Sequence, residues 1–416
     1  MDIRQVLILT PVFVTSLSLS ILLLTITTED NNYVLAQSTS SNQSGNNNNN
    51  NNNNTTSIEG LGYDTKNMTH YSAKQEWQPH LGQANSFVEW RYVTTLLPDA
   101  AGNQYMLFDV IFKYDSKLNP FVMAQPEIAT KMGPSQSYIM LQMELSNYNT
   151  GFHFADVERA LMNRTAVWDS NTNTLNYKTA NYTGSWSYDG HNLTAKLKSQ
   201  KISYNLHMQG GSQVMWAKDR TYNKEGFIQV GVLGNVSFYY SLPRLIVSGN
   251  ISYMDESGNS KTVEGAGQGW VDRQWGDFST SAWEWASFRF NNGARVNMYN
   301  FDGLHQVGTY QKADGSTQWL DNFTVKQNGY AKAPNGDWFS LGWIYDLPID
   351  IEGSKYFTVV PFSKNDTVHI GPTNYSYYEG AGRLIDDMTG MHVGSSINES
   401  MDIAILHNGP YDKNQH

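Results

Sequence analysis

The sequence predicts an all-β protein built from antiparallel sheets, and three observations support this prediction. Aromatic residues make up 13% of the 416 residues, and Ser, Thr and Asn are abundant, a composition that favours strands over helices. Apolar and polar residues alternate with a period of two in many short segments. Turns such as Asn292-Gly293 and Asn335-Gly336 separate these segments, as β-hairpins require. Many short strands at regular spacing are typical of a sandwich or a barrel.

Residues 1–36 are typical of an export segment. Arg4 supplies a positive charge, residues 6–26 are almost wholly apolar, and Val34-Leu35-Ala36 has the small or apolar residues of a cleavage site. The apolar run is long enough to span a bilayer, so a cleaved signal peptide and a retained membrane anchor both fit the pattern. We therefore predict a secreted or cell-surface protein that meets the membrane only through this segment.

Residues 37–57 are of low complexity and include an unbroken Asn run from Asn46 to Asn54. Such a segment cannot bury apolar surface, so we predict a disordered linker. Beyond it, Asn-x-Ser/Thr triplets recur, and each is a potential glycan acceptor on an exported chain. These triplets, which predict a glycoprotein, begin at Asn67, Asn163, Asn181, Asn192, Asn235, Asn250, Asn322, Asn365, Asn374 and Asn398.

The remaining chain is divided into a domain over 58–245, a second domain over 246–408 and a tail over 409–416. Pro243 and Gly249 interrupt the strand pattern near the proposed boundary. Helical periodicity is convincing only over Asp156–Met162, where we expect a short helix. The expected strands include Gln104–Tyr114, Ser137–Leu145, Lys201–Met208, Leu245–Met254, Trp283–Phe290, Ala294–Phe301 and Tyr377–Leu384.

Composition excludes several classes of function. The net charge is −10 and no long basic run exists, so the chain lacks the basic surface of a nucleic-acid binder. The chain has no cysteine, which excludes disulfides, thiolate metal sites and Cys nucleophiles. The histidines lack metal-binding spacing, and Gly265–Trp270 lacks the third glycine of a dinucleotide loop. We therefore expect neither a metal nor a cofactor.

The segment Gly265–Gly276 carries the densest group of chemically useful side chains. In a strand, Trp270, Asp272 and Gln274 share one face, and the residues between them share the other. Burial beside an indole raises the pKa of a carboxyl group, as a general acid requires. The alternative is a structural ion pair between Asp272 and Arg273 that closes one end of a barrel.

Three other carboxylates lie beside aromatic residues. Glu284 is flanked by two tryptophans, an alternation that is usually a core stripe. Glu89 precedes Trp90, and Glu379 follows Tyr378 near the end of the chain. Glu89 and Glu379 are candidates for a second acid or base.

Five segments along about residues 87–385 form one ordered set of motifs: Glu89-Trp90-Arg91-Tyr92, His153-Phe154-Ala155-Asp156, Tyr239-Tyr240-Ser241-x-Pro243 with Gly249, Gly269-Trp270-x-Asp272-x-x-Trp275-Gly276 and Tyr378-Glu379-Gly380-Ala381. In this order they resemble the carotenoid 1,2-hydratase (hydroxyneurosporene synthase) and AttH-like family, which includes kievitone hydratase and fungal decalin-forming Diels–Alderases. Two departures concern Arg91, which replaces an aromatic residue of the family, and residues 386–394, which differ from its usual ending.

This resemblance implies two lipocalin-like (calycin-type) β-barrels packed together, with a pocket for an apolar, often polyunsaturated ligand. If the protein is an enzyme, the resemblance favours a hydratase-type lyase, or an isomerase or cyclase. We expect Asp272 as the acid, Glu89 or Glu379 as the second carboxylate, and Arg273 as the group that orients Asp272. The expected ligand-binding residues are Trp90, Tyr92, His153, Tyr239, Tyr240, Trp270, Trp275, Trp285 and Tyr378.

Two functions therefore remain open. The first is addition of water to a C=C bond of an isoprenoid or polyketide-like molecule, with aromatic faces stabilising the cation and a carboxylate activating water. The second is non-catalytic binding of a lipid, quinone or pigment at the cell surface, with Asp272 and Arg273 purely structural. The predicted export favours the second.

Overall fold

The computed structural model describes twelve parts of the chain, and all of them belong to one compact unit over Ile58–His416. The predicted export segment, the Asn-rich linker, most of the predicted tail and the triplets at Asn67, Asn163 and Asn374 lie outside the described residues. None of the described helices is long and apolar enough to cross a membrane. The described residues are 71–80, 88–114, 137–161, 166–220, 224–230, 235–276, 282–301, 305–333, 335–351, 353–370, 375–401 and 409.

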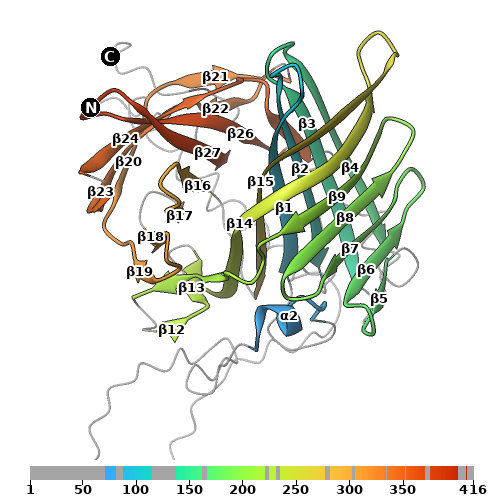
Figure 1. Ribbon diagram of the computed structural model, residues 1–416, viewed down its shortest axis with the longest axis horizontal. Helices are drawn as coiled ribbons and strands as arrows, with labels where there is room; N and C mark the ends of the chain where they lie inside the picture. Colours follow the sequence, from blue (N-terminus) through green and yellow to red (C-terminus); the bar gives the residue numbers. More distant parts are fainter. Residues whose placement is uncertain are drawn as a thin grey trace, which may run out of the picture. The chain divides into compact units, whose positions relative to one another are not determined.

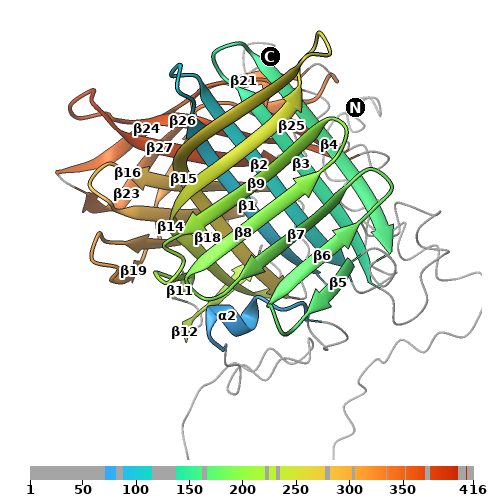
Figure 2. The ribbon, with the colours of Figure 1, turned by 45° about the vertical axis from the view of Figure 1, so that its right-hand side comes forward.

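The first large sheet is antiparallel and forms a nearly closed barrel, with strands β5–β9 in front of β1–β4 in Figure 2. Its order is β4-β3-β2-β1-β15-β14-β9-β8-β7-β6-β5, and β10 and β13 pair with β14. The strands are β1 (Val88–Pro98), β2 (Gln104–Tyr114), β3 (Tyr138–Asn147), β4 (Phe152–Leu161), β5 (Ala166–Asp169), β6 (Thr174–Lys178), β7 (Thr183–Tyr188), β8 (Asn192–Lys198), β9 (Ile202–Gln209), β10 (Met215–Trp216), β13 (Phe227–Val230), β14 (Asn235–Met254) and β15 (Ser260–Gly276).

The second large sheet is also antiparallel, with the order β19-β18-β17-β16-β27-β26-β24-β23-β20, and β25 pairs with β26. Two small ribbons, β11 (Lys218–Asp219) with β12 (Lys224–Glu225) and β21 (Tyr330–Lys332) with β22 (Trp338–Ser340), complete the strands. The strands of the second sheet are β16 (Trp283–Phe290), β17 (Arg295–Phe301), β18 (His305–Gln311), β19 (Thr317–Trp319), β20 (Thr324–Gln327), β23 (Trp343–Ile351), β24 (Ser354–Pro361), β25 (Thr367–Ile370), β26 (Tyr375–Asp386) and β27 (His392–Met401).

A short helix, α2 (Ala73–Glu76), lies at one end of the first sheet (Figure 1). Ser72 caps its N-terminus by accepting a hydrogen bond from the backbone N–H of Gln75, and the Gln75 side chain reaches back to the backbone of Ser72. This reciprocal capping box stabilises a helix that is too short to persist alone.

Buried apolar residues form three clusters that follow the alternation of the strands. One consists of α2 and first-sheet residues such as Trp77, Leu206 and Val271, and another contains Phe288 and Trp343 of the second sheet. The remaining cluster combines residues of both sheets, among them Phe108, Trp270, Trp285 and Ile397. We call this cluster the contact layer, because it fills the space where the two sheets pack against each other (Figure 1).

The predicted all-β fold of two packed antiparallel units is confirmed, but two details differ from the prediction. Residues Asp156–Met162 were expected to form a helix, whereas Asp156–Leu161 belong to β4 and pair residue by residue with β3. Ladder pairing therefore overrides the local helical pattern. The boundary expected at residue 245 lies inside β14, and β15 still belongs to the first sheet, so the chain changes sheet between Gly276 and Trp283.

Candidate functional site

Strand β15 separates two buried environments, because its successive side chains point to opposite faces. Trp270 lies in the contact layer, whereas Val271 and Trp275 lie in the core of the first sheet. The predicted alternation over residues 270–275 is thus confirmed. Asp272 and Arg273, adjacent in sequence, consequently face different surroundings.

Arg273 lies at the end of the first sheet next to α2 and forms a buried ion pair with Glu89. Its guanidinium also donates to the backbone carbonyls of Glu76 and Gln78, each at 3.0 Å. The predicted contact between Arg273 and Asp272 is therefore wrong, since the two side chains leave β15 on opposite faces. Arg273 instead anchors the segment around α2 to the barrel.

Glu89 is surrounded by basic side chains. Lys113 Nζ lies 3.2 Å from its Oε1, and His80 Nδ1 lies 3.0 Å from its Oε2. Burial acts to raise the pKa of Glu89, but Arg273 and Lys113 outweigh it and hold this pKa well below its usual range. Glu89 is therefore an ionised structural carboxylate, and it lies apart from the contact layer.

Two predicted ligand-binding residues belong to the same end of the first sheet. Trp275 stacks on His80 with ring centroids 4.7 Å apart, and the guanidinium of Arg273 lies over its ring. The hydroxyl of Tyr240 donates to the carbonyl of Ala73 at 2.9 Å. We call this group, with Glu76, His80, Glu89, Lys113 and Arg273, the barrel-end cluster.

Asp272 lies in the contact layer and accepts three hydrogen bonds. Ser241 Oγ donates to its Oδ1 at 2.5 Å and Trp270 Nε1 to the same atom at 2.7 Å, while Tyr239 OH donates to Oδ2 at 2.8 Å. Ser241 is directly opposite Asp272 in the ladder of β14 and β15. This register places the three donors around one carboxyl group.

Residues of the second sheet fix the direction of these hydrogen bonds. Trp285 Nε1 donates to Tyr239 OH at 3.2 Å, and Asn297 Nδ2 donates both to this hydroxyl and to Ser241 Oγ. An indole N–H can only donate. The hydroxyl protons of Tyr239 and Ser241 are thereby directed at Asp272, which is an arrangement suited to an ionised carboxylate.

The pKa of Asp272 reflects two opposing effects. Burial raises it, the three hydrogen bonds lower it, and the nearby carboxyl of Glu399 raises it further, with a net pKa of about 7. Asp272 therefore exchanges a proton near neutral pH, which is the property that a general base or acid needs.

A second carboxyl group, Glu379, lies across the contact layer on β26. Tyr92 OH, opposite Asp272 in the ladder of β1 and β15, donates to Glu379 Oε1 at 2.8 Å. Glu379 is directly opposite Glu399 of β27, and the two carboxyls are hydrogen-bonded to each other. Burial and the charge of Glu399 raise the pKa of Glu379 well above its usual range. The pair therefore shares a proton, because two adjacent buried carboxylates cannot both ionise.

Glu399 is absent from the predicted site, although the sequence around it offers a hint that it has a buried partner. It is half-buried between the buried residues Ile397 and Met401 of β27, and its Oε2 accepts a hydrogen bond from Trp283 Nε1 at 3.0 Å. A single carboxylate on an otherwise apolar strand face needs a partner, because burying an unpaired charge is costly.

Arg289 brings a positive charge to the same layer. Its Nη2 donates to Thr94 Oγ1 at 3.1 Å, and its guanidinium lies 5.4 Å from the centre of the Trp270 ring. Its Nε and Nη1 are buried and have no hydrogen-bond partner in the described part of the chain. Burial lowers the pKa of Arg289 to about 10, so it remains protonated at neutral pH.

The remaining predicted residues lie in three different places. Trp90 packs at the margin of the contact layer, 5.6 Å from the Phe112 ring. Tyr378 points away from that layer into the core of the second sheet, where its hydroxyl donates to the carbonyl of Ser363 at 2.9 Å. His153 lies beside Glu144 and Asp366, whose three ligand atoms could hold a metal ion.

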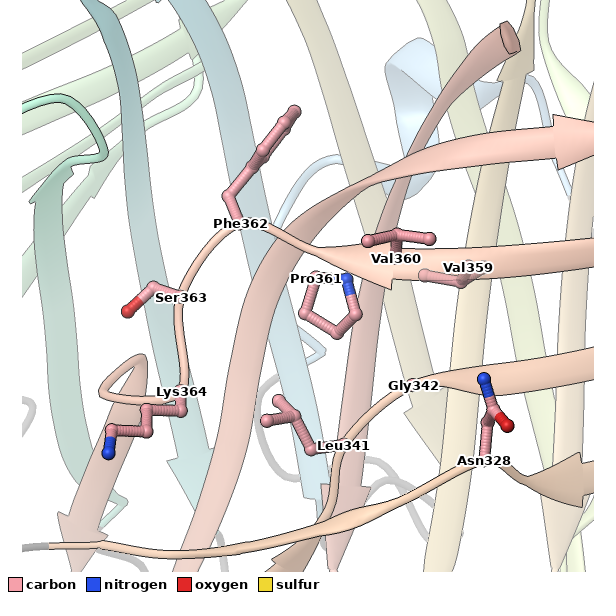
Figure 3. A pocket seen from close by; sticks show the side chains of 9 residues that line it. All are labelled: Asn328, Leu341, Gly342, Val359, Val360, Pro361, Phe362, Ser363 and Lys364. Carbon is pink, nitrogen blue, oxygen red and sulfur yellow. The ribbon is translucent and has the colours of Figure 1, made fainter. Parts of the chain in front are cut away.

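Two surface cavities of about 220 and 430 Å³ are lined by other residues. Figure 3 shows the smaller one, around the end of β24 and the loop that follows it. Neither contains a predicted site residue. The smaller is lined in part by Asn328, Leu341, Pro361 and Phe362, and the larger by Lys218, Asp219, His305 and Trp319.

The sequence and the fold were compared with known proteins. No curated protein sequence matches the chain significantly. A Nitrosomonas europaea protein assigned as AttH is 17% identical in sequence, with a TM-score of 0.58 over 76% of this chain and 92% of that one. Kievitone hydratase from Nectria haematococca is 16% identical, with a TM-score of 0.56 over 80% of this chain and 93% of that one. At these identities the two structures show a shared fold.

The family assignment rests on the sequence itself. Residues 67–396 match the family model described as AttH-like. The match includes all five segments that carry the predicted resemblance, and it covers both large sheets almost completely. The chain therefore belongs to the AttH-like family.

Proposed function

We propose that the protein is an enzyme that adds water across a C=C bond of an apolar small molecule bound in the contact layer. The observation that carries the proposal is the presence of two differently protonated carboxyl systems in one buried aromatic environment. Glu379 shares a proton with Glu399, whereas Asp272 receives three hydrogen bonds as an acceptor. A neutral acid and an ionised base are the two groups that acid-catalysed hydration needs.

In the proposed reaction, Glu379 transfers its proton to one alkene carbon, and the π electrons form the new C–H bond. The faces of Trp270, Trp285 and Tyr299 stabilise the positive charge that develops on the other carbon. A water molecule forms the new C–O bond and gives a proton to Asp272. The net change is the addition of one H and one OH, and solvent returns the proton from Asp272 to Glu379.

Binding in the contact layer requires its aromatic side chains to separate. Trp270 and Trp285 are both buried, with ring centroids 6.4 Å apart in an edge arrangement. Because indole fluorescence responds to its surroundings, entry of a ligand between them changes the emission of the protein. Arg289 Nε and Nη1 have no hydrogen-bond partner among the described residues, so we expect the ligand to carry an oxygen atom that accepts from them.

The likeness of the fold to kievitone hydratase supports the choice of hydration among acid-catalysed reactions of alkenes. We also propose that the enzyme works outside the cytoplasm, because residues 1–36 have the pattern of an export segment. The N-terminal sequence of the protein recovered from the outside of source cells tests this location. An N-terminus at Gln37 supports cleavage, and recovery in the cytoplasm alone contradicts export.

The reaction is tested by feeding full-length protein an apolar lipid extract in H₂¹⁸O. Retained molecules are then identified by native mass spectrometry and organic extraction. We expect a product that is heavier than its precursor by one molecule of H₂¹⁸O. We also expect Glu379→Gln to retain the precursor without converting it, whereas Tyr240→Phe converts it as the wild type does.

Non-catalytic binding is the second candidate, and the three hydrogen bonds that already occupy most acceptor sites of Asp272 favour it. In that case the wild type retains the extracted molecule unchanged and without ¹⁸O. A protein that retains nothing contradicts both candidates.

A further inference from the structure

A separate group of titratable side chains lies at the edge of the contact layer. Glu144 and Ser146 are on β3, and His153 is on β4, opposite Ser146 in the ladder. Asp366 comes from the second sheet, immediately before β25. The group therefore includes residues of both large sheets.

The ligand atoms of the three titratable residues all lie within 4.8 Å of one another. His153 Nδ1 is 3.5 Å from Glu144 Oε1 and 3.8 Å from Asp366 Oδ1. Two ligands of a tetrahedral zinc ion, bound at about 2.0–2.1 Å, lie about 3.3–3.4 Å apart. Small side-chain movements thus bring these atoms to coordination distance.

The carboxyl groups of this site lack a strong cationic partner. His153 is the only ion-pair partner recorded for Glu144 and Asp366 among the described residues, and burial lowers the pKa of its imidazole. Both carboxyl side chains are fully buried. Oε2 of Glu144 has no hydrogen-bond partner in the described structure. A buried carboxyl oxygen without a partner indicates a missing ligand, because such a group is costly to leave unpaired.

Ser146 marks the centre of the group. Its Oγ lies 2.8 Å from Asp366 Oδ1 and 3.2 Å from both Glu144 Oε1 and His153 Nδ1. One hydroxyl proton cannot satisfy all three neighbours. The arrangement also differs from a Ser-His-Asp triad, which uses the two ring nitrogens separately, because here all contacts converge on Nδ1.

We propose that Glu144, His153 and Asp366 bind one divalent transition-metal ion, such as Zn²⁺, and that this ion joins the two sheets. An imidazole nitrogen with two carboxylate oxygens is a ligand set that zinc accepts. His153 is also hydrogen-bonded to the backbone of Thr367, the residue that follows Asp366. Tyr148 OH, 2.9 Å from Asp366 Oδ2, orients the third ligand in the same way.

The test uses full-length, untagged protein that has been treated with a chelator and then titrated with Zn²⁺ by calorimetry. We expect one bound ion per chain and a rise in Tm, because an ion that binds only the folded state stabilises it. In His153→Gln and Asp366→Asn we expect the affinity to fall at least tenfold and the rise in Tm to disappear. Near-UV circular dichroism checks that both variants keep the fold.

His207→Gln is the matched control, since it removes an exposed histidine of β9 that lies outside the group. It is expected to bind Zn²⁺ as the wild type does. The proposal is overturned if the wild type binds no ion, or if the His153 and Asp366 variants keep its affinity. Loss of binding in His207→Gln alone also overturns it, because the ion would then occupy a surface site.

Discussion

The two faces of β15 hold buried carboxylates under opposite electrostatic conditions. On one face, the barrel-end cluster pairs Glu89 with Arg273, Lys113 and His80. On the other, the contact layer holds Asp272, Glu379 and Glu399, none of which forms an ion pair with a lysine or arginine among the described residues. The pKa of Glu89 is held well below its usual range, while those of Asp272, Glu379 and Glu399 are raised.

Burial alone does not distinguish a structural carboxylate from a chemically useful one. Glu89, Asp272 and Glu379 are buried and Glu399 is half-buried, and burial raises the pKa of each of these carboxyl groups. The difference comes from the neighbours. Cations keep Glu89 permanently charged, whereas hydroxyl, indole and carboxyl partners leave the contact layer able to exchange protons near neutral pH. The predictions below test this distinction.

The largest loss of stability is expected from Arg273→Met. The change leaves the buried carboxylate of Glu89 without its closest cation, and breaking a buried ion pair from one side costs about 3–5 kcal/mol. Urea unfolding measures the effect. The double variant Glu89→Gln/Arg273→Met should lose less stability than the sum of the two single changes. A loss below about 1 kcal/mol in Arg273→Met would contradict a structural role.

Asp272→Asn is expected to lower the rate of the proposed reaction by roughly 10²–10⁴-fold, the usual contribution of a general base. Its free energy of unfolding should fall by about 1–3 kcal/mol, because the amide N–H group that replaces a carboxylate oxygen faces another hydrogen-bond donor and finds no acceptor. Turnover in H₂¹⁸O and urea unfolding measure the two effects.

Asp109→Asn is the control for Asp272→Asn. Asp109 is a buried carboxyl with a pKa also raised by burial to about 7, but it accepts its hydrogen bond from Tyr204 and lies outside the contact layer. It should keep its activity. Equal loss of activity in Asp109→Asn and Asp272→Asn would contradict the proposed role of Asp272 as the general base.

The two faces of β15 should respond to pH in opposite ways. The folded-state pKa of Glu379 is raised, so its contribution to stability is complete below its unfolded pKa and is lost as the pH rises through the folded value. The folded-state pKa of Glu89 is lowered, so its contribution is present above its unfolded pKa and is lost as the pH falls. Tm should therefore decrease both above about pH 5 and in strong acid.

Glu379→Gln separates these two effects. Glutamine is close in shape to the protonated carboxyl and cannot ionise, so the decrease of Tm above the unfolded pKa of glutamate should become shallower, while the decrease in strong acid remains. Scanning calorimetry from strong acid to mildly alkaline pH gives both slopes. An unchanged slope at high pH would show that Glu379 is already ionised in the folded protein.

The smallest effect is expected from Tyr240→Phe, which removes one hydrogen bond to the carbonyl of Ala73 and should cost about 1 kcal/mol with no change in turnover. Tyr239→Phe removes a donor to Asp272 and should lower turnover. The two tyrosines are adjacent on β14 and point to opposite faces. This pair of variants therefore compares the barrel-end cluster with the contact layer on the strand next to β15. Similar activity in Tyr239→Phe and Tyr240→Phe would argue against a role of Asp272 in the reaction.

The sequence allowed the strands and their faces to be predicted, because period-two alternation is a local property. The opposite orientations of Asp272 and Arg273 followed from it directly. The partners could not be predicted, since Glu89 meets Arg273, and Tyr92 meets Glu379, across more than 180 residues. The same limit explains why Glu399 and Asp366 were missed and why Tyr240 and Trp275 were assigned to the ligand.

The pairing of the strands also bears on how the chain is made. In each large sheet the first strand pairs with the last, β1 with β15 and β16 with β27. A ribosome adds about 5–20 residues per second, so β1 waits roughly ten seconds or more for its partner after its own synthesis. Contacts between such distant segments also form slowly. Each half of the protein therefore emerges with one edge of its first strand unpaired, because the other edge pairs with the next strand at once. A chaperone or rapid export must shield this edge from other chains.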